Sequence, residues 1–229
     1  MVVSVHFADL GPRAVATLAR GWRHPVSRPG LAAADLALAV PLCGSPITPR
    51  AGGRLGLIAF WSDDHGAERF REDHPLGRAL KDGWHAVLEP LRITGSWPGL
   101  APEVPHASPA ASDDPVVGLT LTRVRPSRAV SFLRMSAPAQ REALASPGLI
   151  WGTNLVDPGR RVAGTCSLWR SQDALTTYVH GSRRSSHRTA VAEDRRRPIF
   201  EQAAFLRLRV VRASGHLDGS VPLSWGTPS

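Results

Sequence analysis

The strongest constraint on this chain is that it repeats itself. The alternating apolar and polar pattern of residues 2–7 predicts a half-buried β-strand, and residues 116–121 have the same pattern. A proline follows each strand, Pro12 in the first copy and Pro126 in the second, where it suits the first turn of a helix. Such self-similarity predicts two copies of one supersecondary unit.

Each copy continues in the same order after this helix. A Pro-Gly-Leu turn, at residues 29–31 and again at 147–149, leads into a second strand. The third strand ends in a tryptophan, Trp61 or Trp169, and the polar residues after it can cap another helix. That helix is interrupted in both copies, and a last strand closes each copy. The order is therefore strand, helix, strand, strand, helix, strand, twice.

Helical spacing of apolar residues predicts which helix faces are buried. After Pro75 this spacing continues to Val87 and predicts a further helix there, so that the closing strand of the first copy covers only residues 91–94. The predicted buried faces of the two first helices are Val15, Leu18 and Trp22 in one copy and Ala129, Val130 and Leu133 in the other.

The expected fold class is α+β, with two ferredoxin-like βαββαβ repeats fused into one α+β barrel. Helices cover one face of each sheet, and the bare apolar face of one copy can be buried against the sheet of the other. We assign residues 1–97 to the N-terminal repeat and 116–229 to the C-terminal repeat. The segment 98–115 between them is rich in proline and alanine and is expected to be an extended linker. Two independent domains are the alternative.

Composition narrows the partners and the location. The formal net charge is +9, but Lys81 is the lone lysine and, apart from residues 195–197, the arginines are scattered. This favours a solvated surface with a few anion sites over a nucleic-acid-binding protein. No apolar run reaches the roughly 20 residues of a membrane span, so no integral membrane segment is expected. Two cysteines, Cys43 and Cys166, cannot form a disulfide framework. The expected location is the cytoplasm, with peripheral attachment to a membrane left open.

One histidine has a setting that suits a cofactor. His187 begins a predicted helix after a loop of small residues, with Arg183, Arg184 and Arg188 beside it. A neutral imidazole can ligate haem iron, and arginines can pair with the haem propionates. The residues alone favour an ordinary helix-start histidine among solvated arginines, and they leave His180 open as another ligand.

Several stretches of the chain resemble the spheroidene monooxygenase family, which comprises carotenoid-tailoring oxygenases. The similarity spans most of the chain. The matching stretches are 92–97, 121–128, 147–149, 166–169, 187–191 and 200–208.

The resemblance implies a haem-dependent oxygenase with haem b as cofactor and His187 as the ligand of its iron. Arg128 and Arg188 are then candidate cofactor-binding cations. Trp169 is a candidate cofactor-binding residue, because alternation places it on one strand face with Thr165 and Ser167. That face is expected to form a wall of the haem site.

The expected substrate is a hydrophobic small molecule, such as a carotenoid or another natural product. Residues 151–157 depart from the glycine- and glutamate-containing stretch expected of the family, and because residues there can line the substrate side, a natural product other than a carotenoid is included among the expected substrates. The electrons are expected from a ferredoxin and its reductase, or from peroxide, and homo-oligomerisation is left open. The alternatives are a haem-free, cofactor-independent monooxygenase or isomerase of the same barrel class, and a non-catalytic protein that binds haem, lipid or pigment.

Overall fold

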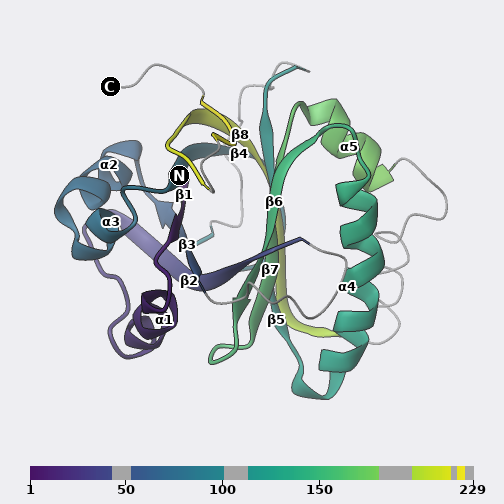
Figure 1. The fold of residues 1–229 in the computed structure, drawn as a ribbon, viewed down its shortest axis with the longest axis horizontal. Coiled ribbons are helices and arrows are strands. Elements are labelled where there is room, and N and C mark those ends of the chain that lie inside the picture. The colour runs from purple at the N-terminus through teal and green to yellow at the C-terminus, as the bar shows by residue number, and fades with distance from the viewer. Residues whose placement is uncertain (43–52, 101–112, 181–197, 218–220, 225–229) are drawn as a thin grey trace.

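A computed structural model of the chain describes residues 1–42, 53–100, 113–180, 198–217 and 221–224. Its eight strands form one closed, antiparallel barrel with the order β1-β3-β2-β6-β7-β5-β8-β4 (Figure 1). Helices lie outside the barrel. The predicted fold class, two ferredoxin-like repeats fused into one α+β barrel, is confirmed.

The N-terminal half of the barrel contains four strands and three helices. The strands are β1 (Val2–Asp9), β2 (Leu31–Pro41), β3 (Arg54–Trp61) and β4 (Trp84–Gly95). The helices are α1 (Arg13–Arg23), α2 (Asp64–Asp73) and α3 (Pro75–Ala79). The Asp63 carboxylate caps α2 by accepting from the Gly66 N–H (2.9 Å), as the polar residues after Trp61 predict.

The C-terminal half repeats this order. Its strands are β5 (Val116–Val124), β6 (Leu149–Asp157), β7 (Val162–Trp169) and β8 (Phe200–Ser214). Its helices are the short 3₁₀ turn η1 (Pro126–Arg128), α4 (Ala129–Leu144) and α5 (Gln172–His180). Residues 101–112 of the predicted linker lie outside the described residues.

Both halves have the same strand order, which is direct evidence of duplication. The N-terminal half reads β4-β1-β3-β2 and the C-terminal half reads β8-β5-β7-β6. Two seams close the barrel between them. At one seam β2 pairs with β6, from Leu38 opposite Val156 onwards, and at the other β4 pairs with β8.

The interior of the barrel is one hydrophobic core shared by both halves. Inward side chains alternate along every strand, and the two halves contribute to a single cluster of buried residues. Three aromatic rings pack inside it: Phe7 and Trp84 have centroids 6.2 Å apart, and Trp151 lies 5.0 Å from Phe7. Neither repeat could bury its inner face alone, so the two halves fold as one barrel.

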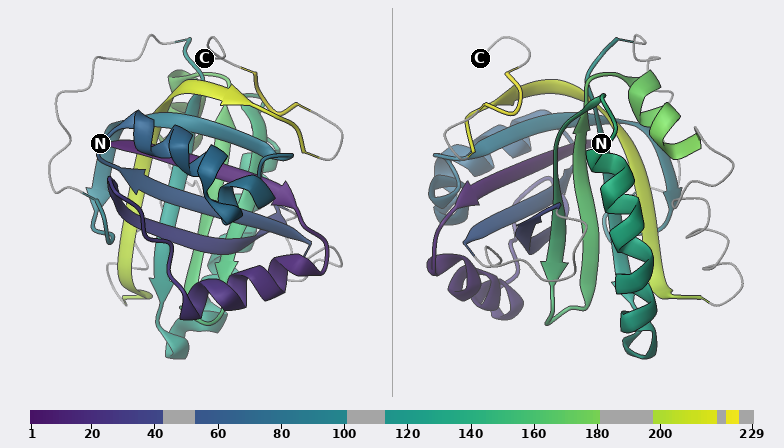
Figure 2. Two further views of the ribbon diagram at one scale, coloured as in Figure 1. Left: turned by 90° about the vertical axis from the view of Figure 1, so that its left-hand side faces the viewer. Right: turned by 45° about the vertical axis from the view of Figure 1, so that its right-hand side comes forward.

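The helices form two separate layers on the outer side of the barrel. Helices α1, α2 and α3 lie across the N-terminal strands, and α4 and α5 lie beside the C-terminal strands (Figure 2). Among the described residues, no helix is long and apolar enough to cross a membrane.

Two expectations about helix packing are wrong. Among the predicted buried positions, Val15, Trp22, Val130 and Leu133 are 42% to 61% exposed, whereas Leu18 is buried. Helix α1 turns Ala14 and Leu18 to the sheet, whereas Val15 and Trp22 stay exposed.

The predicted helix through Val87 is also wrong, since β4 already begins at Trp84. Asp82 and Gly83 break the helix after α3, and Trp84, Ala86 and Leu88 then alternate into the barrel core. A helical spacing of Leu80, Trp84 and Val87 thus coincides with a strand that has period two.

Candidate functional site

The barrel register makes the two outer faces directly comparable. Trp61 lies opposite Val2 as Trp169 lies opposite Val116, so β3 corresponds to β7 and β1 to β5. Counting back from the tryptophans, each outward residue of one half has a counterpart in the other.

The N-terminal outer face is closed. The outward side chains of β3 are Leu55, Leu57, Ala59 and Trp61, and each is at most 1% exposed. They pack against buried residues of α1 and α2, among them Leu18 and Phe70, in one continuous hydrophobic layer. No ligand can reach this face while its helices are in place.

The C-terminal outer face is open in comparison. At the positions of Leu55, Leu57 and Ala59, strand β7 has Ala163, Thr165 and Ser167, and all three are half-exposed. The neighbouring strands β5 and β8 add further half-exposed residues in register with Thr165 and Ser167. We call the set of Gly118, Thr120, Thr165, Ser167 and Phe205 the C-terminal floor.

Helix α4 explains why this floor stays open. Ala143 is the one residue of α4 that is buried in the structure as described, and none of the residues 129–134 is buried. The C-terminal part of α4 is held in place by polar contacts: Asn154 Nδ2 donates to Gln140 Oε1 (3.1 Å), and the Tyr178 hydroxyl donates to the Ala139 carbonyl (3.1 Å). The N-terminal part therefore runs beside the sheet without sealing it.

Trp169 lies at one end of the floor. Its indole Nε1 donates to Ser167 Oγ (2.9 Å), which agrees with the predicted shared face. The ring is fully buried and stacks on Tyr178 with centroids 4.9 Å apart. Trp169 thus supports the wall beneath α5.

The other predicted site residues fall in different places. Arg128 is half-exposed at the end of η1, directly before α4. His180 is exposed at the last position of α5. His187 and Arg188 lie outside the described residues, so their roles stay predictions.

Arg207 is a site residue that sequence analysis missed. It projects from β8 on the outer face, between Gly118 of β5 and Arg92 of β4. Burial and the nearby positive charge of Arg92 lower the pKa of Arg207. The signal available in the sequence was the alternation of arginines with apolar residues from Leu206 to Val210, which marks an outward arginine row.

A second polar group lies inside the closed N-terminal layer. Trp61 Nε1 donates to Ser4 Oγ (2.8 Å), which lies 3.2 Å from His6 Nε2. His6 stacks on His85, its cross-strand neighbour, with ring centroids 5.9 Å apart. The His85 Nε2 is 3.0 Å from both Arg71 and the Ser214 hydroxyl.

Both of these imidazoles are held neutral. Burial, together with the charges of His85 and Arg71, lowers the pKa of His6 to about 3. Burial and the charges of Arg71 and Arg212 lower the pKa of His85 to about 4. Sequence periodicity could place His6 on a strand but could not pair it with His85, because that pairing is made by the barrel.

Asp35 is another missed group, at the inner side of β2. Trp97 Nε1 donates to its carboxylate (2.6 Å), and burial raises the pKa of Asp35. The Arg123 guanidinium lies 5.5 Å from the centroid of the same Trp97 ring. These contacts tie the end of the N-terminal repeat to β2 and β5, which is a structural role.

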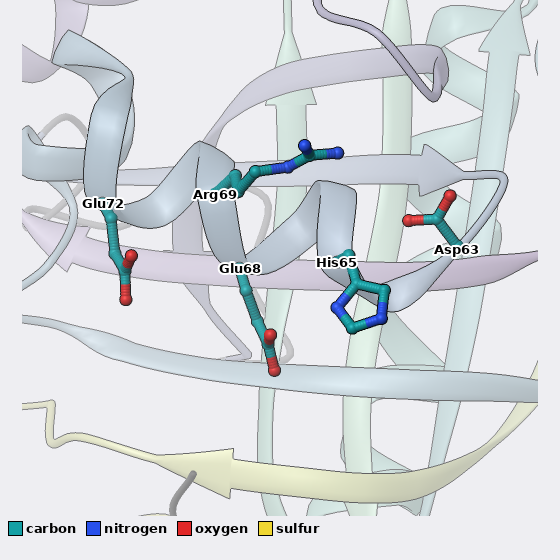
Figure 3. A pocket seen from close by; sticks show the side chains of 5 residues that line it. All are labelled: Asp63, His65, Glu68, Arg69 and Glu72. Atoms are coloured by element: carbon teal, nitrogen blue, oxygen red, sulfur yellow. The ribbon is translucent and has the colours of Figure 1, made fainter.

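An acidic surface hollow of about 390 Å³ lies along α2. Figure 3 shows Glu68 and Glu72 on one side of this helix, with Arg69 directed away from them. Its groups already have structural partners, since Asp63 caps α2 and Glu68 pairs with Arg212. In the part of the chain that the structure describes, no group of three or more His, Cys, Asp or Glu residues could hold a metal ion.

The described cysteine is inert. Cys166 points into the barrel core, where it is 1% exposed, and burial raises the pKa of its thiol to about 12. A thiol with such a pKa stays protonated and is a poor ligand or nucleophile. The C-terminal floor is therefore the best candidate site among the described residues.

The chain resembles two known enzymes in sequence. It is 23% identical over 195 residues to the spheroidene monooxygenase of Rhodobacter capsulatus, covering 80% of this chain and 79% of that protein. It is 27% identical over 170 residues to the spheroidene monooxygenase of Rubrivivax gelatinosus, covering 72% of this chain and 64% of that protein. The matched region thus spans less than two thirds of the Rubrivivax protein. The predicted resemblance to this family is confirmed.

No protein-family model matches the chain. Among solved structures, a candidate monooxygenase from Fusobacterium nucleatum aligns with 99% of this chain and 98% of its own, at 9% identity and a TM-score of 0.43. Another, from Lactobacillus acidophilus, aligns with 93% of this chain and 95% of its own, at 10% identity and a TM-score of 0.40. Likenesses at this level do not indicate a shared function.

Proposed function

We propose that this chain is a haem-dependent oxygenase that acts on a hydrophobic small molecule, such as a carotenoid or another natural product. The observation that carries the proposal is the contrast between the two outer faces. Duplicated halves share one barrel core, yet only the C-terminal half leaves its helix-covered face half-exposed. The resemblance to spheroidene monooxygenases supports the reaction class.

The C-terminal floor has the chemistry that haem b needs from a binding surface. Thr120 and Thr165 carry small side chains at half-exposed positions, so a flat macrocycle can lie against this part of the sheet, whereas Leu175 of α5 packs over Gly118 at its other end. The aromatic ring of Phe205 adds apolar contact area. At the edge of the floor, the half-exposed guanidinium of Arg207 provides a cation for a carboxylate group.

The iron ligand is proposed to be His187, on the strength of the family resemblance. Arg188 beside it and Arg128 at the start of α4 are the proposed further cations. His180 is the alternative ligand. It lies at the end of α5, which is the described position nearest to His187 in the sequence. Haem bound here would supply activation of O₂ or peroxide, with electrons from a ferredoxin and its reductase in the former case.

The protein's own contribution is to bind, orient and exclude water. Thr120 and Thr165 are cross-strand partners on the floor, and their hydroxyls can donate hydrogen bonds to a polar group on a ligand. The buried Trp169–Tyr178 stack keeps the wall beneath α5 rigid. A rigid floor holds bound molecules in one orientation, which favours a single reaction outcome.

The test is an absorption spectrum of protein expressed with a haem precursor. We expect a Soret band in the wild type that is lost or shifted in His187→Ala. The matched control is His216→Ala, which removes an exposed histidine that directly follows Gly215, a residue in contact with Gly83 and Trp84 of the N-terminal half.

Each other outcome points to a different function. A band unchanged by His187→Ala would remove His187 and favour His180. No band, even after addition of haemin, would favour a haem-free, cofactor-independent monooxygenase or isomerase. A band without turnover of any hydrophobic substrate, with either peroxide or reduced ferredoxin, would favour a haem- or pigment-binding protein.

A further inference from the structure

Helix α4 has apolar side chains on the side that faces away from the barrel. Val130, Leu133 and Leu144 are 61%, 44% and 50% exposed. Their spacing, with Ala137 between them, places them on one face of the helix. We call the following set the outer stripe of α4: Val130, Leu133, Arg134, Ala137, Arg141 and Leu144.

The opposite face of α4 makes the contacts with the barrel. The Phe132 ring meets the Phe200 ring of β8 edge-on, with centroids 6.0 Å apart, and Ala143 is buried. The Ala139 carbonyl accepts from the Tyr178 hydroxyl of α5. Helical spacing places Phe132, Ala139 and Ala143 together, on the side away from the outer stripe. The outer stripe is therefore exposed because of the way in which α4 is held.

The outer stripe is also positively charged. Arg134 and Arg141 lie two turns apart on it, and both are exposed. The one carboxylate of α4, that of Glu142, lies elsewhere. Burial and the charge of Glu142 raise the pKa of Tyr178 to about 12, so this carboxylate is beside α5. Apolar and cationic side chains thus share one exposed face, without an acidic residue of the same helix.

Helix α1, the counterpart of α4 in the N-terminal half, lacks this combination. It also has exposed apolar residues, Val15 and Trp22, and exposed arginines, Arg13 and Arg20. Helical spacing, however, places Val15 and Trp22 on one side of α1 and the two arginines on another. Trp22 in addition donates to the Asp157 carboxylate within the protein.

The charge of the outer stripe decides which partner it fits. Two copies of the protein that met through this stripe would place Arg134 and Arg141 against the same arginines of the other copy, and like charges in contact are unfavourable. A membrane with anionic lipids offers negative headgroups above an apolar layer. Helix α4 lies along the outside of the molecule, where a flat surface can contact it over its length (Figures 1 and 2).

We propose that the outer stripe of α4 binds the surface of a membrane that contains anionic lipids. Val130, Leu133 and Leu144 enter the headgroup region, and Arg134 and Arg141 pair with lipid phosphates. The inference goes beyond the proposed function and does not depend on haem. It places the C-terminal half next to the phase in which hydrophobic molecules dissolve.

The experiment is sedimentation of the full-length protein with lipid vesicles. One set contains phosphatidylcholine alone, and the other contains equal parts of phosphatidylcholine and phosphatidylglycerol. We expect binding to the anionic vesicles that weakens as salt is added. Arg134→Gln combined with Arg141→Gln should lose about tenfold to thirtyfold in affinity. Val130→Asp, which removes apolar area and adds a negative charge, should lose about tenfold.

Helix α1 provides the matched controls. Arg13→Gln combined with Arg20→Gln removes the same charge at the same spacing, from exposed positions in the other helix layer. Val15→Asp makes the change of Val130→Asp at a valine that is 52% exposed. Both controls should change the affinity by about twofold at most. Far-ultraviolet circular dichroism checks that all variants fold.

Three results would overturn the inference. The first is a wild type that does not bind the anionic vesicles. The second is an equal loss of affinity in the α1 and α4 variants, which would mean that the net charge attracts the vesicles without the outer stripe. The third is a dimer in sedimentation velocity that Val130→Asp separates, which would make the stripe an interface between two copies. Because haem takes no part in these measurements, each result leaves the test of the proposed function independent.

Discussion

The two halves of this barrel share their inner faces and differ in their outer ones. Inward positions of both halves are mostly apolar and meet in one core, with Asp35 as a polar exception. Outward, the N-terminal half has Leu57 where the C-terminal half has Thr165, and His6 where the latter has Thr120. A duplicated unit must keep its inner face to close the barrel, whereas each outer face is free to serve either stability or binding.

The difference predicts how stability is divided between the halves. In the described residues the N-terminal helix–sheet layer contains eleven buried hydrophobic residues and the C-terminal layer contains four. A face that is left open for a ligand gives up packing, as functional sites commonly do. Each of the following predictions tests one side of this comparison.

The largest effect is expected from truncating the closed face. Leu57→Ala should cost about 2–5 kcal/mol of the free energy of unfolding, because it leaves a cavity in a fully buried layer. Thr165→Ala, at the corresponding half-exposed position, should change it by less than about 1 kcal/mol. Urea denaturation of both variants measures the two values. Equal losses would mean that the C-terminal face is as closed as the N-terminal one.

The second effect is a loss of stability in acid that belongs to the N-terminal half. The pKa of His6 falls from 6.5 to about 3 on folding, so the unfolded chain takes up the proton first as the pH drops. The contribution of neutral, buried His6 to the free energy of unfolding is fully present above pH 6.5 and is lost as the pH falls from there towards 3. Between pH 7 and pH 5 the expected loss is on the order of 2 kcal/mol.

His85 and Arg71 face His6 and add to its cost of protonation, whereas the counterpart Thr120 does not titrate. Denaturation midpoints measured across this range should therefore fall less steeply with decreasing pH in His6→Gln, and the slope that remains belongs to His85, whose pKa is also lowered. A wild-type profile that is already flat would contradict the buried, neutral state of His6.

A third, smaller effect concerns a side-chain contact between the two halves. Trp22 Nε1 of α1 donates to the Asp157 carboxylate at the end of β6 (2.9 Å), and Asp157 is 1% exposed. Trp22→Phe should lower the free energy of unfolding by about 1 kcal/mol, because it removes one partner of a buried carboxylate. The transition should stay single, as expected of one shared core. Two separate transitions by circular dichroism would show that the halves unfold independently.

The smallest effect on stability, with the clearest effect on binding, comes from making the open face resemble the closed one. Thr165→Leu introduces on the C-terminal floor the leucine that the N-terminal half has at the corresponding position, Leu57. It should raise the free energy of unfolding by about 0.5 kcal/mol, since apolar area is covered at a half-exposed position. It should also weaken haem binding in a Soret titration. Unchanged haem affinity would place the ligand away from this floor.

Much of the fold could be predicted because its signals are local. Alternation marked the strands that begin at Val2 and Val116, proline marked the first helices, and the two tryptophans marked the ends of corresponding strands. Local signals failed where the same apolar residues fit both the period of a helix and the period of a strand. Leu80, Trp84 and Val87 satisfy helical spacing, yet Trp84 and its alternating neighbours belong to a strand in the barrel core.

The candidate site was predictable only in part. Alternation alone placed Thr165, Ser167 and Trp169 on one face, and family resemblance pointed to the C-terminal half. The cation pair was not predictable, because Arg92 and Arg207 are 115 positions apart in sequence and meet only where the barrel closes. The same holds for the stacked pair of His6 and His85.

The sequence by itself determined the repeat, the order of strands and helices, and the apolar inner faces that force the two copies into one barrel. These properties follow from short-range periodicity and from turn chemistry, which every residue expresses within its own segment. Only the tertiary structure decided which outer face is closed and which is open. Exposure depends on how closely a helix approaches a sheet, and that distance is set by side chains from several segments at once.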